Sequence, residues 1–164
     1  MKLQEGDLDF TFDGAISAIK FDDGITLATS SIQPVDFVIE YANLYRFVEV
    51  KDPDIPGAVN VEAFREKLKS GKLIQSLAGK YRDSQFFHRF QGKSDKDVEY
   101  VVLLSMNVLD DALLLTKQDE LKRSIPICHK SWPCDSASCC VILNINQWKR
   151  LYGEDAVRRR SEAT

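Results

Sequence analysis

The sequence predicts a single mixed α/β domain. Segments patterned as strands and as helices alternate along the chain, which is the order expected for a sheet covered by helices. Residues 98–106 form a nearly continuous apolar run, as a strand covered on both faces does. With 164 residues, 44% of them hydrophobic and 29% charged, the chain is long enough for one core and has an ordinary globular composition.

The first third is expected to hold one helix and three strands. Apolar residues at helical spacing, with Asp13 available as an N-cap, predict a short helix near 13–21 that ends at the turn signal of residues 22–24. Segments rich in β-branched and aromatic residues predict strands at 25–31, 35–41 and 45–51. A short connection makes the last two a hairpin, and the prolines of 52–57 end it because proline cannot donate to a strand ladder.

The rest of the chain alternates helices with strands. Gly71 is expected to separate two amphipathic helices, and residues 91–95 form a loop. The first of these helices has an apolar stripe over 61–68, and the second has one from 73 to 84 that runs towards Phe90. The remaining predicted elements are helices at 110–123 and 147–152 and strands at 98–106 and 139–144. The tail from Arg158 to Glu162 is expected to be frayed.

We expect one domain over residues 1–164, with a core at about 9–107 and a C-terminal extension of helix and strand at about 108–157. The apolar runs are far shorter than the ~20 residues of a membrane span. The first residues lack the apolar centre of a secretory signal. The expected location is therefore cytoplasmic, with no membrane partner, and the four cysteines are expected to be free thiols.

The hairpin carries the most informative polar residues. If its strands pair about a turn between residues 42 and 43, facing residue numbers sum to 85, and Asp36 faces Glu49. Because side chains alternate along a strand, Lys51 lies on the same face as Glu49. Two facing carboxylates repel unless a cation lies between them or one takes a proton. Oxygen ligands of this kind suit Mg²⁺, so the hairpin predicts a magnesium site.

Pro34-Val35-Asp36 followed by Glu49-Val50-Lys51 resembles the signature of the PD-(D/E)XK nuclease superfamily, which includes restriction endonucleases. The resemblance implies a restriction endonuclease-like α-β-β-β-α-β core with a mixed central sheet. It also implies metal-dependent phosphodiester hydrolysis of nucleic acid, with DNA rather than RNA as the expected substrate. Mg²⁺ is the expected cofactor, and Mn²⁺ can take its place.

The resemblance implies roles residue by residue. Asp36, Glu49 and the main-chain carbonyl of Val50 hold the metal, and Asp36, Glu49 and Lys51 are catalytic, with Lys51 orienting the attacking water. Two departures are visible: Val35 interrupts the Pro-Asp pair, and the first predicted helix lacks the glutamate of many members. Only Glu5 and Asp13 lie nearby, which puts a second metal ion in doubt.

The helix after the hairpin is expected to supply nucleic-acid contacts. Residues 65–96 carry 9 Lys and Arg against 3 Asp and Glu, whereas residues 1–60 carry 4 against 11. Basic side chains can bind phosphates, which dominate nucleic-acid affinity. The expected contacts are Lys72, Gln75, Lys80 and Arg82, of which Gln75 or Lys72 could match a further motif of the family. A polar face in contact with solvent explains the same residues, and a homodimer is compatible with either interpretation.

Two alternatives stay open. Cys128, Cys134, Cys139 and Cys140 lie near His129 and could bind zinc, although their spacing fits poorly and the last two begin an apolar run. The chain could also be a non-catalytic binding or assembly module that keeps a nuclease-like fold, with the hairpin acids in a structural ion-pair cluster.

Overall fold

The computed structural model describes residues 1–23, 32–58, 60–106 and 111–162. Its centre is a five-stranded mixed sheet in the order β3-β4-β5-β6-β7. The strands are β3 (Ser17–Lys20), β4 (Phe37–Glu40), β5 (Leu44–Lys51), β6 (Asp97–Leu104) and β7 (Cys139–Leu143). β3, β4 and β5 are antiparallel neighbours, whereas β5, β6 and β7 are parallel. The predicted mixed α/β class is confirmed.

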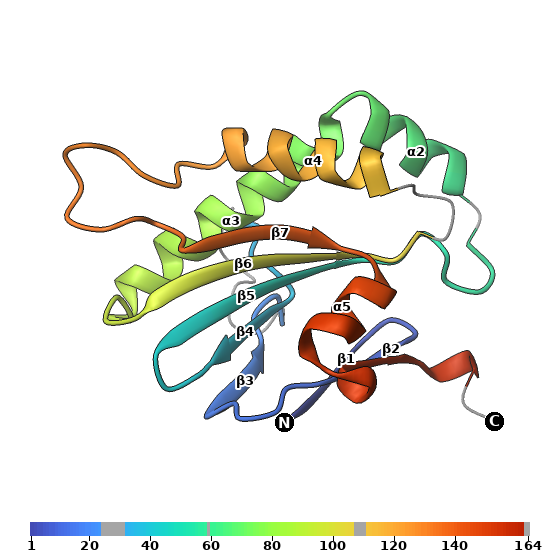
Figure 1. Cartoon of the computed structure of the whole chain (residues 1–164), viewed down its shortest axis with the longest axis horizontal. Helices are drawn as coiled ribbons and strands as arrows, with labels where there is room; N and C mark the ends of the chain where they lie inside the picture. The colour runs from blue at the N-terminus through green and yellow to red at the C-terminus, as the bar shows by residue number, and fades with distance from the viewer. Residues whose placement is uncertain (24–31, 59, 107–110, 163–164) are drawn as a thin grey trace.

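Three helices cover one face of this sheet: α2 (Val61–Lys69), α3 (Lys72–Phe90) and α4 (Asp111–Ser124) (Figure 1). The apolar stripe predicted for the second helix is buried against the sheet, where Leu77 and Tyr81 pack with Phe47 and Tyr100. We call this cluster the helical-face core. Gly71, in the left-handed region with φ 77°, separates α2 from α3 as the sequence predicts.

The other face of the sheet is covered by the two ends of the described chain together with α5 (Ile145–Tyr152) (Figure 1). β1 (Lys2–Glu5), β2 (Leu8–Thr11) and β8 (Val157–Arg159) form a small antiparallel sheet in the order β1-β2-β8. Single 3₁₀ turns, η1 (Glu154–Ala156) and η2 (Arg160–Glu162), flank β8. Phe10, Phe37, Val48 and Trp148 pack here in an opposite-face core.

The helix predicted near 13–21 is wrong, because the segment contains β3. Its apolar residues do not form a buried helical stripe: the exposed fractions of Ile16 and Ile19 are 56% and 42%. Gly14 has φ 72°, which interrupts a right-handed helix at its start. Pairing of β3 with β4 satisfies the backbone instead. The strand predicted at 25–31 lies outside the described residues.

The prediction that residues 158–162 form a frayed tail is also wrong. Residues 157–159 form β8, whose partner is β2 at the other end of the chain. Arg159 explains the order of this segment, since its guanidinium binds both carboxylate oxygens of Asp52 at 2.8 and 2.9 Å and the Ser105 hydroxyl at 2.7 Å. The N-terminal hairpin of β1 and β2 was not predicted.

Among the helices that the structure describes, none combines the length and the apolarity that crossing a membrane requires.

Candidate active site

The predicted hairpin register is confirmed. Phe37 pairs with Val48 and Val38 with Phe47, so facing numbers sum to 85 and Asp36, just before β4, lies across from Glu49. Val38 and Phe47 belong to the helical-face core. Because side chains alternate, Asp36 and Glu49 turn toward the same face as these two residues, where α3 lies.

Both acids are buried. The exposed fraction of Glu49 is 0% and that of Asp36 is 5%. Asp36 Oδ2 accepts a hydrogen bond of 2.6 Å from the main-chain N–H of Val50. Lys51 lies on the Glu49 face, with its Nζ 2.5 Å from Glu49 Oε1 and its side chain 27% exposed. The hairpin therefore brings Asp36, Glu49, Val50 and Lys51 together at the carboxyl end of β5.

Lys80 of α3 completes the cluster. Its Nζ is 2.7 Å from Glu49 Oε1 and 3.4 Å from Asp36 Oδ1, so one ammonium contacts both carboxylates. The sequence placed Lys80 among the nucleic-acid contacts and missed this position. Helical geometry indicates that Lys80 lies on the buried side of α3, because it is only ~40° from the buried Ser84 and ~60° from the buried Leu77 around the helix axis.

Segment 33–36 is held against α3 by hydrogen bonds from its main-chain N–H groups to side chains of the helix. The N–H of Val35 donates to Ser84 Oγ at 2.8 Å, and the N–H of Gln33 donates to Asp83 Oδ2 at 2.9 Å. On the other side, Asp36 accepts at its main-chain oxygen from Phe21. These contacts fix where the Asp36 carboxylate lies.

Burial and repulsion shape the charges of the cluster. Burial raises the pKa of Glu49, the negative charge of Asp36 raises it further, and the two lysines oppose the rise. For Lys80, burial lowers the pKa, but the carboxylates of Glu49 and Asp36 outweigh burial and the net shift is upward. Lys80 is therefore a firmly held ammonium, whereas Glu49 is an acid that gains from additional positive charge.

The oxygen atoms of the cluster fit a hard divalent cation. Glu49 Oε2 is buried and has no hydrogen-bond partner among the described residues. The main-chain N–H and C=O of one strand residue point to the same side, so the Val50 carbonyl, like its N–H, points toward Asp36. Within the described residues no three His, Cys, Asp or Glu side chains form a metal-binding group, so the donors here are two carboxylates and a main-chain oxygen.

Asp22 is a further acid near the cluster. Its sequence context predicts only a turn and no functional role. Burial raises its pKa, and the charge of Asp36 adds to the rise. Of the two acids considered for a second metal, Glu5 forms an ion pair of 2.9 Å with Lys20, and its charge also raises the pKa of Asp22. Asp13 lines a hollow beside Tyr41 and Trp148, near the opposite-face core.

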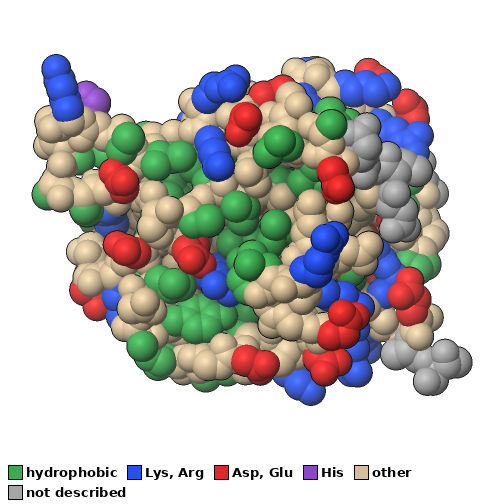
Figure 2. Space-filling model, in the orientation of Figure 1, with side chains coloured by type: hydrophobic (Ala, Val, Ile, Leu, Met, Phe, Trp, Pro, Cys, Tyr) green, Lys and Arg blue, Asp and Glu red, His purple; other side chains and the backbone are tan. Residues whose placement is uncertain are grey.

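The other predicted nucleic-acid contacts do not touch the cluster. Lys72, Gln75 and Arg82 are exposed on α3. Arg82 lies ~200° around the helix from Lys80, and its guanidinium is 3.4 Å from the main-chain oxygen of Ser124 in α4. On the face in Figure 2, acidic and basic side chains are interspersed with apolar ones.

The cysteines do not converge on a common point. Cys128 and Cys134 are exposed, whereas Cys140 is buried. Cys139 and Cys140 are consecutive in β7, so their side chains point to opposite faces of the sheet. Burial raises the pKa of the Cys140 thiol to about 12, the behaviour of an inert core cysteine.

No model of a known protein family matches this chain, and no curated protein matches it. Among solved structures the chain is similar to the crystal structure of the small subunit of the heterodimeric restriction endonuclease R.BspD6I. The TM-score is 0.43 and the sequence identity 13%, over 86% of this chain. The match spans 60% of that subunit, which is less than two thirds of its length.

Proposed function

We propose that the cluster of Asp36, Glu49, Lys51 and Lys80 is the active site of a metal-dependent nuclease that hydrolyses phosphodiester bonds. DNA rather than RNA is the proposed substrate. The observation that carries the proposal is that two buried carboxylates, one in β5 and one just before β4, turn toward one point. The Lys80 ammonium contacts both, so a positive charge fits between them. A buried oxygen, Glu49 Oε2, has no hydrogen-bond partner in the part of the chain that the structure describes and remains available as a ligand.

Asp36, Glu49 and the Val50 carbonyl would hold Mg²⁺, or Mn²⁺ in its place. The bound ion would supply Lewis-acid polarisation of a phosphate oxygen and a more acidic water. Lys51 is suited to act on the reacting group because its side chain is 27% exposed while its ammonium stays at Glu49. It can orient the attacking water through a hydrogen bond from Nζ and stabilise negative charge that develops on the phosphate.

The substrate class rests on the resemblance of the hairpin motif to PD-(D/E)XK nucleases. Lys72, Gln75 and Arg82, exposed on α3, remain the proposed phosphate contacts of a nucleic-acid strand.

The test compares the parent protein with Glu49→Gln, Asp36→Asn and Lys51→Ala. Melting temperatures are measured in EDTA and with Mn²⁺, and cleavage of plasmid DNA and of RNA is followed in parallel. A metal that binds the folded state alone stabilises it by RT ln(1 + [M]/Kd), so the parent should melt higher with Mn²⁺. Both acid variants should lose this gain and the cleavage. Lys51→Ala should keep the gain and lose cleavage, by on the order of 10²-fold.

Two further variants sharpen the comparison. Lys80→Ala removes the ammonium that competes for the carboxylates and should increase the Mn²⁺-dependent rise in melting temperature. Glu62→Gln, whose side chain is 71% exposed on α2, is the matched control and should leave both readouts unchanged. Loss of cleavage in this control to the same extent would contradict the assignment to the hairpin.

The pairing of two carboxylates with two ammoniums also supports a second candidate, a non-catalytic binding or assembly module. In that case the four side chains form a structural ion-pair cluster. The parent should then melt at the same temperature with and without Mn²⁺. Lys51→Ala and Lys80→Ala should destabilise most, because each leaves a buried carboxylate with one counter-charge fewer.

A further inference from the structure

A second concave site lies on the side of α3 away from the hairpin acids. It is a cavity of about 390 Å³ between α3 and the connection from α4 to β7, within the ~300–1,000 Å³ typical of ligand pockets. Tyr81, Pro126, Trp132 and Pro133 contribute rings to its lining. None of the residues of the candidate active site lines it.

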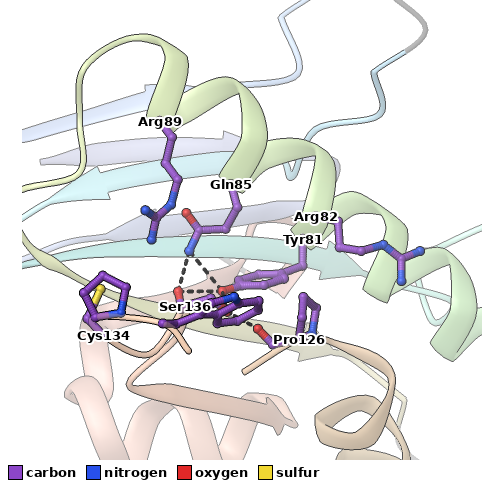
Figure 3. A pocket seen from close by; sticks show the side chains of 9 residues that line it. Tyr81, Arg82, Gln85, Arg89, Pro126, Cys134 and Ser136 are labelled. Atoms are coloured by element: carbon purple, nitrogen blue, oxygen red, sulfur yellow. Dashed lines mark hydrogen bonds between the residues drawn. The ribbon is translucent and has the colours of Figure 1, made fainter. Parts of the chain in front are cut away.

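A hydrogen-bond network holds the connection against the helix. The Tyr81 hydroxyl donates to the main-chain oxygen of Ser136 at 2.7 Å, and the Gln85 carboxamide donates to the same oxygen (Figure 3). Ser136 Oγ in turn donates to the Pro126 carbonyl. At the other end, the main-chain N–H of Trp132 donates to the His129 carbonyl at 2.9 Å. These bonds hold the Ser136 end of the connection against α3 and close the turn at residues 129–132, and such preorganisation lowers the cost of binding.

Two arginines of α3 flank the pocket along the helix. Arg82 and Arg89 are seven residues apart, ~10 Å along the axis, with Gln85 between them and Tyr81 directly before Arg82 (Figure 3). Neither guanidinium forms an ion pair with any residue that the structure describes, although Arg82 contacts the Ser124 carbonyl. Gln85 is nine-tenths buried, and its Oε1 has no hydrogen-bond partner in the described part of the chain.

We propose that this pocket binds one unpaired nucleotide of a nucleic-acid strand. The base packs on the exposed ring of Trp132, and the phosphates on the two sides of its sugar contact Arg82 and Arg89. Stacking on aromatic rings and arginine contacts to phosphate are how proteins bind single strands regardless of sequence. A pocket with an apolar centre and a cation at each end fits a nucleotide with two flanking phosphates better than it fits a ligand with a single charged end.

The site shares with the proposed nuclease the nucleic-acid partner and one proposed phosphate contact, Arg82. It needs neither Asp36 nor Glu49 nor a metal, so binding can be measured in EDTA, where metal-dependent cleavage is absent. Failure of the nuclease proposal and failure of this one are then distinguishable.

Tryptophan fluorescence provides the readout. The chain has two tryptophans, and Trp132 is 43% exposed whereas Trp148 is 1% exposed in the opposite-face core. Deoxyadenosine 3′,5′-bisphosphate and an eight-residue deoxyadenosine oligonucleotide should quench the emission saturably. The 5′-monophosphate and deoxyadenosine should bind on the order of tenfold or more weakly, since each lacks a phosphate for an arginine. Trp132→Phe should abolish the quenching.

Arg82→Ala and Arg89→Ala should each weaken binding on the order of tenfold. Arg150→Ala, which removes an exposed arginine from α5, is the charge-matched control and should have no effect. Binding of a labelled oligonucleotide, followed by anisotropy, confirms each affinity in variants whose melting temperatures match the parent. Equal affinity for the monophosphate and the bisphosphate, equal loss in Arg150→Ala, or quenching that persists in Trp132→Phe would each overturn the proposal.

Discussion

Glu49 illustrates what a charge requires on the covered face of a sheet. Its side chain is fully buried, and its neighbours on that face, Phe47 and Val38, belong to an apolar core. Burying an ionised carboxylate is unfavourable unless counter-charges and hydrogen bonds compensate. Lys51 and Lys80 supply them within 2.7 Å.

His88 predicts how stability depends on pH. It is 1% exposed, and both ring nitrogens lack hydrogen-bond partners in the described chain. Burial, reinforced by the charge of Lys93, lowers its pKa from 6.5 to about 4. Between these values the unfolded chain binds a proton that the folded protein does not, so stability falls as pH drops from about 6.5 toward 4. The loss should approach about 3 kcal/mol at 1.36 kcal/mol per pKa unit.

The measurement is urea unfolding across this pH range for the parent and for His88→Met, which has no titratable ring. The variant should lose less stability on acidification than the parent. His129→Gln is the matched control, since His129 is exposed in the connection before β7 and is the only other histidine of the sequence. Parallel pH curves for the parent and His88→Met would contradict the prediction.

Single residues were predictable where strand alternation alone decides their position. The face shared by Asp36, Glu49 and Lys51 follows from their numbers once the turn is placed. The role of Lys80 was not predictable in this way. Its partners lie 31 and 44 residues earlier in the chain, and how α3 is docked on the sheet decides which lysine of the helix reaches them.

At the scale of elements, the contact of α3 with segment 33–36 depends on Ser84. Its hydroxyl accepts from the Val35 N–H, and both residues are 0% exposed. Ser84→Ala would leave that N–H buried and unpaired, which should lower the free energy of unfolding by about 1–3 kcal/mol. Urea denaturation measures the loss. Ser76→Ala, at an exposed position of the same helix, should be within about 0.5 kcal/mol of the parent.

Elements were predictable where local pattern and tertiary packing agree. The break at Gly71, the two helices beside it and the parallel strand β6 have patterns that burial reinforces. Residues 13–21 show the opposite case. Their apolar residues match a helix, but the edge of β4 offers backbone hydrogen bonds that only a strand can use. Local periodicity contains no information about such a partner.

At the scale of the molecule, Arg159 connects four separate segments. Its guanidinium contacts Asp52 after β5, Ser105 after β6 and Asp7 in the turn of the N-terminal hairpin. Arg159→Ala would leave Asp52, whose side chain is 9% exposed, without its bidentate partner. We expect a loss of about 3–5 kcal/mol in the free energy of unfolding.

Arg159→Lys should recover only part of this loss, because an ammonium cannot reproduce the two parallel hydrogen bonds of a guanidinium. Arg158→Ala is the control on the same strand, since its side chain is 66% exposed and its ion pair with Asp9 is long at 3.7 Å. Thermal unfolding compares the three. A loss in Arg158→Ala equal to that in Arg159→Ala would show that the strand, rather than the guanidinium, provides the stability.

The pairing of β2 with β8 has a consequence for how the chain folds during its synthesis. Phe10 lies opposite Val157, so a strand made among the first residues acquires its neighbour only near residue 157. At ~5–20 residues per second, about 7–30 s of translation separate the two. During this time Phe10 and Phe37 lack the cover that Trp148 later gives them. The nascent chain therefore passes through a state with exposed aromatic surface, the kind of surface that chaperones bind and that aggregation exploits.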